Sequence, residues 1–195
     1  EQLAAATLQA FAALRHDFQP EPMRPHYLLS LHDVSRVLGG LCMLGAFQPK
    51  DICKQSRLWL HECLRVFCNC LSNKVDSDLA TDRLQEIAHL SLGLTWDGST
   101  HVDNCAPCFS ALATWQPGAV QACLCPYNEV PSLAEVQTRI EDSFDEHQEG
   151  CCRTVLCEAA VEHILRILRP ISDDFCGAIL IGGRQSGRRS LARTA

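Results

Sequence analysis

The stretch Cys176-Gly-Ala-Ile-Leu-Ile-Gly-Gly-Arg-Gln-Ser-Gly-Arg-Arg-Ser-Leu-Ala-Arg-Thr-Ala195 contains the pattern that decides the fold. Residues 178–181 are apolar and short enough for a buried parallel strand, two glycines end that strand, and residues 190–192 begin a helix. This order is typical of a phosphate-binding loop, in which backbone N–H groups and a helix N-terminus contact phosphate oxygens. These residues alone fit two interpretations equally, such a loop and a plain turn with a solvated basic face.

The loop matches the general motif G-x-x-x-x-G-K-[ST] only in part. Gly182 and Gly187 occupy the glycine positions, but Arg188 replaces the lysine and Arg189 replaces the hydroxyl residue that binds magnesium. Arginine keeps its charge and can hold two phosphate oxygens, whereas Arg189 offers the metal no oxygen. We therefore predict weak ATP binding with little magnesium dependence and no catalytic residue. The candidate nucleotide-binding residues are Gly182, Gly183, Ser186, Gly187, Arg188, Arg189 and Ser190.

Composition limits the classes of function. The 195 residues are 47% hydrophobic and carry a formal net charge of −6, and the only basic run is residues 184–193, so nucleic-acid binding has little support. No apolar run approaches the ~18 residues of a membrane span, and no basic region of a secretory signal is visible at the first residues. The chain does not begin with methionine and stops early in a helix, so we expect an excerpt from a longer protein.

Residues 1–92 have the pattern of a helical bundle. Apolar residues recur at helical spacing over residues 1–18, from residue 31 or 32 to about 40, over 49–71 and over 79–92. The third pattern predicts burial of Trp59, Val66 and Phe67. His61 and Glu62 are adjacent and point about 100° apart on a helix, so separate polar contacts are favoured over an acid–base pair.

Residues 93–126 lack periodicity and are predicted to be an irregular, cysteine-rich insertion. Cys105 and Cys108 form a C-x2-C pair, and Cys123 and Cys125 follow as a tighter pair, with His101 as a substitute ligand. Because the second spacing is one residue short for a zinc ribbon, we predict no metal site. The alternative is a non-enzymatic helical interaction module whose cysteine-rich loop binds zinc.

Residues 127–170 are predicted to form a helical connector. Ser132-Leu-Ala-Glu135 has the form of a capping box and begins an apolar stripe that reaches residue 147. A second stripe over residues 154–168 ends at Pro170, because proline cannot continue the helix. The fold class is therefore mainly α, and residues 171–195 begin an α/β module.

Four strings resemble sequences of one known family. Residues 26–37, His-Tyr-Leu-Leu-Ser-Leu-His-Asp-Val-Ser-Arg-Val, are similar to His-Tyr-x-Phe-Asn-Leu-Arg-Asp-Leu-Ser-Arg-Val. Residues 57–67, Arg-Leu-Trp-Leu-His-Glu-Cys-Leu-Arg-Val-Phe, are similar to Arg-Leu-Trp-x-His-Glu-x-x-Arg-Val-Phe. Residues 158–167 resemble Asp-Ala-x-x-His-x-x-Arg-Ile, and residues 182–191 align with Gly-Val-Gly-Gly-Ser-Gly-Arg-Gln-Ser-Leu. These strings are those of the dynein heavy chain, a ring of AAA+ modules that moves along microtubules.

The resemblance implies a fold and a function. Residues 1–92 would be the helical lid of the third AAA+ module, and residues 171–195 the truncated start of the fourth. The parent would be an ATP-driven, minus-end-directed motor, of the axonemal type, in the cytoplasm, the cytoskeleton and the axoneme of a cilium. Its partners would be the other AAA+ modules of the same chain, microtubules, and dynein intermediate and light chains. This chain shows no Walker B acid, catalytic glutamate or arginine finger, so alone it is not expected to hydrolyse ATP.

Three departures from the family pattern bear on the site. His32 stands where an arginine is placed to act as a nucleotide sensor, and histidine is shorter and neutral for much of the time at pH 7. Arg184 and Gln185 replace two loop glycines, and their side chains crowd the approach of backbone to phosphate. Residues 93–125 fall outside the likeness, either as a lineage-specific insertion or as an error of gene prediction.

Overall fold

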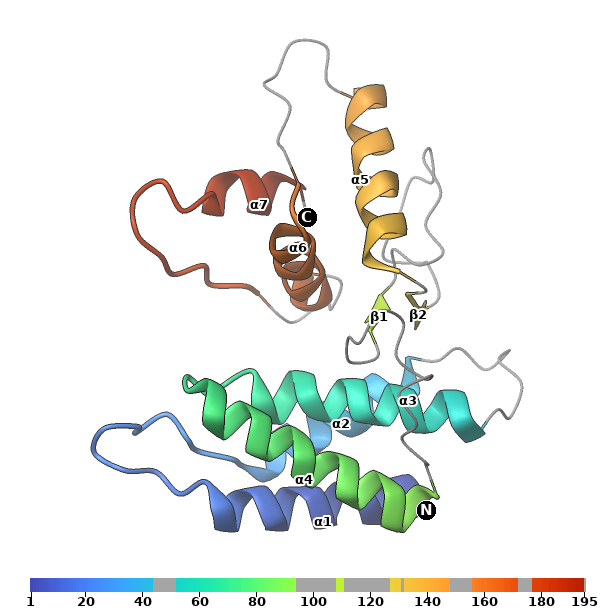
Figure 1. The fold of residues 1–195 in the computed structure, drawn as a ribbon, viewed down its shortest axis with the longest axis vertical. Coiled ribbons are helices and arrows are strands. Elements are labelled where there is room, and N and C mark those ends of the chain that lie inside the picture. The colour runs from blue at the N-terminus through green and yellow to red at the C-terminus, as the bar shows by residue number, and fades with distance from the viewer. Residues whose placement is uncertain are drawn as a thin grey trace. The chain divides into compact units, whose positions relative to one another are not determined.

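The structure, a computed structural model, describes residues 1–43, 52–93, 108–110, 127–130, 132–147, 156–171 and 177–194. These residues are mainly α-helical, as predicted (Figure 1). The chain divides into two compact units, Glu1–Cys108 and Phe109–Ala195. No helix among the described residues is long and apolar enough to cross a lipid bilayer.

The described residues of the first unit form a helical bundle. Its helices are α1 (Gln2–Asp17), α2 (Leu31–Cys42), α3 (Ile52–Cys63) and α4 (Lys74–Leu92). Helix α1 lies along α4, and α2 packs against α3 (Figure 1). A single π-turn, η1 (Leu64–Cys68), continues α3, and in it the Asn69 N–H donates to the Leu64 carbonyl at 3.2 Å. The predicted helical bundle over residues 1–92 is therefore confirmed.

Trp59 is the largest side chain at the centre of this bundle. It is 0% exposed, and Phe67 and Val66 are buried with it, as predicted. The indole Nε1 donates a hydrogen bond of 2.9 Å to Oγ1 of Thr7, which itself donates to the Leu3 carbonyl at 2.7 Å. The polar edge of the indole is thus satisfied inside the core, which a buried tryptophan requires.

Asp76 connects the segment between α1 and α2 to the start of α4. Its Oδ2 accepts a hydrogen bond from Nη1 of Arg24 at 2.5 Å and another from the Tyr27 hydroxyl at 2.9 Å. The Ser72 N–H in turn donates to the Tyr27 oxygen at 3.2 Å. Residues far apart in sequence therefore fix the path of this proline-rich segment, which has no helix of its own.

Helix α4 begins earlier than the apolar pattern predicted. The pattern starts at residue 79, but the helix starts at Lys74, because Asn73 caps it by accepting a hydrogen bond from the Val75 N–H at 3.2 Å. Its end is Gly93, whose φ of +66° is the left-handed conformation in which glycine commonly terminates helices.

The second unit contains α5 (Leu133–His147), α6 (Glu158–Ile171) and α7 (Arg188–Thr194), with β1 (Phe109–Ser110) and β2 (Asn128–Glu129). The two strands pair antiparallel, with Phe109 opposite Glu129. Helix α5 packs against α6, and Oγ of Ser132 accepts from the Ala134 N–H at 3.1 Å at the predicted helix start. Pro170 lies one residue inside the end of α6.

Two predicted details differ from the structure. Phe109 and Ser110 form a strand inside the segment predicted to be irregular, because residues 128 and 129 supply a partner. Residues 178–181 are not a buried strand: Ile179 is 89% and Ile181 92% exposed. A parallel strand is covered by its own sheet and helices, and among the described residues the only paired strands are β1 and β2. Burial of this segment therefore depends on more than its own apolar residues.

Candidate phosphate-binding site

The loop between residues 182 and 187 leads directly into α7. Arg184 and Gln185 form a turn, Gly187 has a φ of +76°, and α7 begins at Arg188. The Leu191 N–H donates to the Gly187 carbonyl at 2.9 Å, which closes the first helical turn. The predicted order of a glycine loop followed by a helix is present.

Arg188 folds back over the loop. Its Nη2 donates to the Gly183 carbonyl at 3.2 Å. A Cβ atom placed on Gly182 would lie 2.9 Å from Oγ of Ser186 and 3.4 Å from Cδ of Arg188, so both side chains lie close to that glycine. Gly182 is therefore required for this close approach, and the guanidinium lies on the loop itself. An entering phosphate would have to exchange with the Gly183 carbonyl as the partner of Arg188.

Gln185 is the one non-glycine residue with a positive φ among those described, at +63°. A side chain in this left-handed conformation costs about 1–2 kcal/mol relative to the ordinary one, a cost that glycine avoids. The family string that this loop resembles has glycine at this position. The loop therefore has a backbone conformation that suits glycine at a position where glutamine stands. The substitution therefore strains the loop in addition to placing a side chain near the phosphate position.

The loop and helix are strongly basic. Residues 177–194 include Arg184, Arg188, Arg189 and Arg193 and no acidic residue. Arg189 and Ser190 lie in the first turn of α7, and both are exposed. Such a charge pattern favours an anion over a hydrated metal cation, and Ser190 is the hydroxyl nearest to the position at which the motif places a magnesium ligand.

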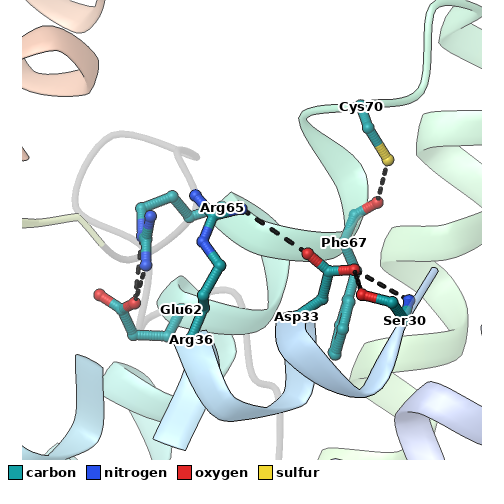
Figure 2. A network of polar contacts seen from close by, with 7 residues as sticks. All are labelled: Ser30, Asp33, Arg36, Glu62, Arg65, Phe67 and Cys70. Atoms are coloured by element: carbon teal, nitrogen blue, oxygen red, sulfur yellow. Dashed lines mark hydrogen bonds and ion pairs between the residues drawn. The ribbon is translucent and has the colours of Figure 1, made fainter. Parts of the chain in front are cut away.

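The predicted sensor position lies in the first unit. His32 is exposed in the first turn of α2, whereas the loop of residues 182–187 belongs to the second unit. Asp33 beside it accepts hydrogen bonds from both the N–H and the hydroxyl of Ser30, each at 2.9 Å, and its other oxygen lies 3.6 Å from Nη1 of Arg36 (Figure 2). His32 thus stands on a helix start that its neighbours fix.

A buried ion pair between Glu62 and Arg65, which the sequence did not identify, lies near Asp33 and Arg36 (Figure 2). Glu62 is 0% exposed, and its Oε2 accepts from Nη2 of Arg65 at 2.6 Å and from Nε at 3.0 Å (Figure 2). A Cβ atom placed on Gly40 of α2 would lie 2.8 Å from Cγ of Glu62 and closer still to its carboxylate. The absence of a side chain at Gly40 therefore makes room for the buried carboxylate of Glu62.

The residues considered above as zinc ligands lie mostly outside the part of the chain that the structure describes. Cys108 is half-buried, whereas Cys105, Cys123, Cys125 and His101 lie outside the described residues, so the absence of a zinc site there stays a prediction. Within the described ranges no cluster of three or more histidine, cysteine or acidic side chains could hold a metal ion. Burial raises the pKa of the Cys68 thiol to about 12.

Comparison with known families identifies both ends of the chain. Residues 1–77 match the family described as "Dynein heavy chain, ATPase lid domain", and residues 153–195 match the family described as "P-loop containing dynein motor region D4". The chain belongs to the dynein heavy chain family. Its helical bundle is accordingly the dynein lid, and its basic loop falls in the dynein P-loop region, as the sequence strings indicated.

The dynein relatives align with nearly the whole chain. Dynein axonemal heavy chain 2 of mouse is 30% identical over 97% of this chain, and the human protein of that name is 32% identical over the same share. The dynein beta chain of the flagellar outer arm of Chlamydomonas reinhardtii is 29% identical over 100% of it. The aligned regions thus extend across residues 93–125. This chain spans 4% of the length of each of these relatives.

Proposed function

We propose that the chain is a part of an axonemal dynein heavy chain, a motor that uses ATP to move toward microtubule minus ends in cilia or flagella. The observation that carries the proposal is the presence, in one chain and in this order, of the dynein lid match and the match to dynein motor region D4. Relatives named as axonemal and as flagellar support the ciliary assignment. Residues 1–92 then serve as the lid of the third module, residues 127–170 as a connector, and residues 171–195 as the start of the fourth.

The partners and place of action follow from this assignment. The chain works with the other AAA+ modules of the same heavy chain, and the parent binds microtubules and dynein intermediate and light chains. Its location is the cytoskeleton of the cytoplasm and the axoneme. These proposals rest on the names of the relatives and on the family of the two matched regions.

The basic loop binds ATP weakly in this proposal. The side chain of Arg188 leaves the Gly183 carbonyl and holds phosphate oxygens, and the backbone N–H groups of Ser186, Gly187 and Arg188 face the same anion. Magnesium adds little, because Arg189 has taken the place of its hydroxyl ligand and only Ser190 or water remains.

A titration with ATP tests this site. The protein used is a heavy chain that continues through the rest of the fourth module, because isolated loops bind phosphate poorly, and binding is measured by calorimetry with magnesium and with EDTA. We expect affinities that agree within about threefold in the two conditions. A large gain with magnesium would contradict the role given to Arg189, and the Arg189→Ser variant should restore such a gain.

Restoring the two loop glycines gives a second test. Arg184→Gly with Gln185→Gly relieves the positive φ at position 185 and removes two side chains from the phosphate position. We expect ATP affinity to rise about tenfold or more, because two side chains leave the phosphate position. The Arg193→Gly variant, which changes charge without changing the loop, is the matched control. Equal affinities in the two variants and the parent would refute the proposed obstruction.

A further inference from the structure

Two connections between helices meet at one end of the lid bundle. Residues 18–30 join α1 to α2, and residues 69–73 join the π-turn η1 to α4 (Figure 1). Because α1 lies along α4 and α2 packs against α3, both connections cross between the same two helix pairs. Hydrogen bonds tie one connection to the other, so they hold this end of the bundle closed.

Tyr27 is the centre of these contacts. Its hydroxyl donates to Oδ2 of Asp76 at 2.9 Å and accepts from the Ser72 N–H at 3.2 Å. The residue is 3% exposed, and its ring lies edge-on to that of Phe18, with 6.4 Å between the ring centroids. A buried hydroxyl is costly without hydrogen-bond partners, so Tyr27 is stable in this position only while α4 supplies them.

Asp76 holds the first connection at a second point. The oxygen that accepts from Tyr27 also accepts from Nη1 of Arg24, and that guanidinium lies 5.7 Å from the centroid of the Tyr27 ring. The Asp76 side chain is 14% exposed, so its ion pair with Arg24 is screened less by solvent than a surface pair. Asp76 lies in the first turn of α4, where the helix dipole favours a negative charge.

The segment that these contacts hold has little regular structure of its own. Residues 19–29, all of which the structure describes, lie outside the helices and include three prolines, which donate no backbone hydrogen bond. Its printed backbone bonds are local, from the Arg24 N–H to the Glu21 carbonyl and from the Tyr27 N–H to the Arg24 carbonyl. Segments of this kind open at a lower free energy than packed helices.

The opening has a border on each side of this segment. The Phe18 N–H donates to the Leu14 carbonyl at 2.9 Å and closes the end of α1. Ser30 and Asp33 form a capping box that fixes the start of α2 without contributions from residues 19–29. Both helices can therefore keep their ends while the residues between them move.

We propose that residues 19–29 and the start of α4 open and close as one cooperative unit, joined by Arg24, Tyr27, Ser72 and Asp76. When Tyr27 leaves, Asp76 loses a donor and the Ser72 N–H loses its acceptor, next to the Asn73 cap that begins α4. The hydrogen bond from Trp59 to Thr7 lies in neither segment, so the core stays folded.

This unit acts as a conformational device between the two helix pairs. Because both connections at this end are released together, the α1–α4 pair gains freedom to move against the α2–α3 pair there. A substitution in one connection therefore changes the mobility of the other, about fifty residues away. The inference concerns the bundle alone and does not rest on the proposed ATP binding.

Hydrogen–deuterium exchange of the 195-residue chain, followed by mass spectrometry of its peptides, tests this coupling in both directions. Asp76→Ala should raise the exchange rate of residues 19–29 about tenfold or more, although the substitution lies in α4. Tyr27→Phe, which keeps the ring and removes the hydroxyl, should raise the exchange rate of residues 72–77 about fivefold or more. Peptides from α1 and α3 should change less than about twofold in either variant.

Asp82→Ala is the matched control, because it removes an exposed carboxylate from the same helix. It should change the exchange rate of both segments less than about twofold. If each substitution raises exchange only in its own segment, the two connections open separately and the proposal is wrong. A rise of equal size in α1 and α3 would also overturn it, because the whole bundle would then be opening.

Discussion

Adding one methyl group to Gly40 should destabilise the lid, although alanine is the better helix former. The new Cβ would lie 2.8 Å from Cγ of Glu62 and nearer to its carboxylate, and Cβ atoms essentially never approach heavy atoms within 3.0 Å. Either the carboxylate leaves Arg65, or α2 moves away from α3. Breaking a buried ion pair costs about 3–5 kcal/mol, and overpacking costs about 1–3 kcal/mol. The gain in helix propensity is about 1 kcal/mol, so the expected net loss is about 2–4 kcal/mol if the ion pair breaks and up to about 2 kcal/mol if α2 moves.

The neighbouring glycine supplies the control. Gly39 lies in the same helix, and a Cβ placed on it would meet nothing within 4 Å. Gly39→Ala should therefore leave stability unchanged or raise it by up to about 1 kcal/mol. Two adjacent and chemically identical substitutions are thus predicted to have opposite signs.

Urea unfolding followed by the fluorescence of Trp59 measures both variants, in a background in which the other two tryptophans are phenylalanine. In the Glu62→Ala background the cost of Gly40→Ala should disappear, because the clashing side chain is gone. If the two alanine variants shift the unfolding midpoint in the same direction, or if the cost persists without Glu62, the close approach of Gly40 to Glu62 is not what limits this position.

Trp59→Ala should lower the unfolding free energy by about 3–5 kcal/mol in urea titrations, and Trp59→Phe by less, because the latter loses mainly the hydrogen bond to Thr7. The hydrogen bond from His16 and then that from Arg83 lower the pKa of Asp17 below its usual 3.8, so their stabilisation is present above that value and is lost as pH falls through the lower folded pKa. Arg83→Ala should accordingly reduce stability near pH 7 and match the parent near about pH 2, as urea midpoints across pH would show. Since burial raises the pKa of Cys68 to about 12 and Cys42 is exposed, iodoacetamide at about pH 8 should alkylate only Cys42 of this pair in the native chain, and both in urea.

Helices with a continuous apolar stripe could be predicted from the sequence, because their burial follows from a spacing within one segment. The residues Trp59, Val66 and Phe67 are examples, and all three are buried. The start of α4 was placed too late, since its first turn is fixed by polar contacts of Asn73 and Asp76, whose partners lie two and about fifty residues away. The spacing of residues within one segment carries no information about partners that lie about fifty residues away.

The candidate site could likewise be predicted only where its structure depends on neighbouring residues in the sequence. The order of glycine loop and helix could be predicted, because glycine and the start of α7 act locally. The exposure of Ile179 and Ile181 could not, since an apolar strand is buried only by its neighbours. Glu62 was interpreted as an ordinary polar contact, because nothing near it in sequence indicates that Gly40 makes room for its carboxylate.

The π-turn at Leu64–Cys68 is a place where the chain can lose one residue and remain helical. A turn closed by a hydrogen bond from residue 69 to residue 64 contains one more residue than an α-helical turn. Deleting one residue there would leave an ordinary helical turn, with Trp59 still in place before it. The same deletion within Ile52–Cys63 would rotate every later side chain by about 100° and remove Trp59 or Glu62 from the core. When the lid sequences of different dyneins are aligned, length differences of one residue should therefore occur at this turn and be absent from the helix that precedes it.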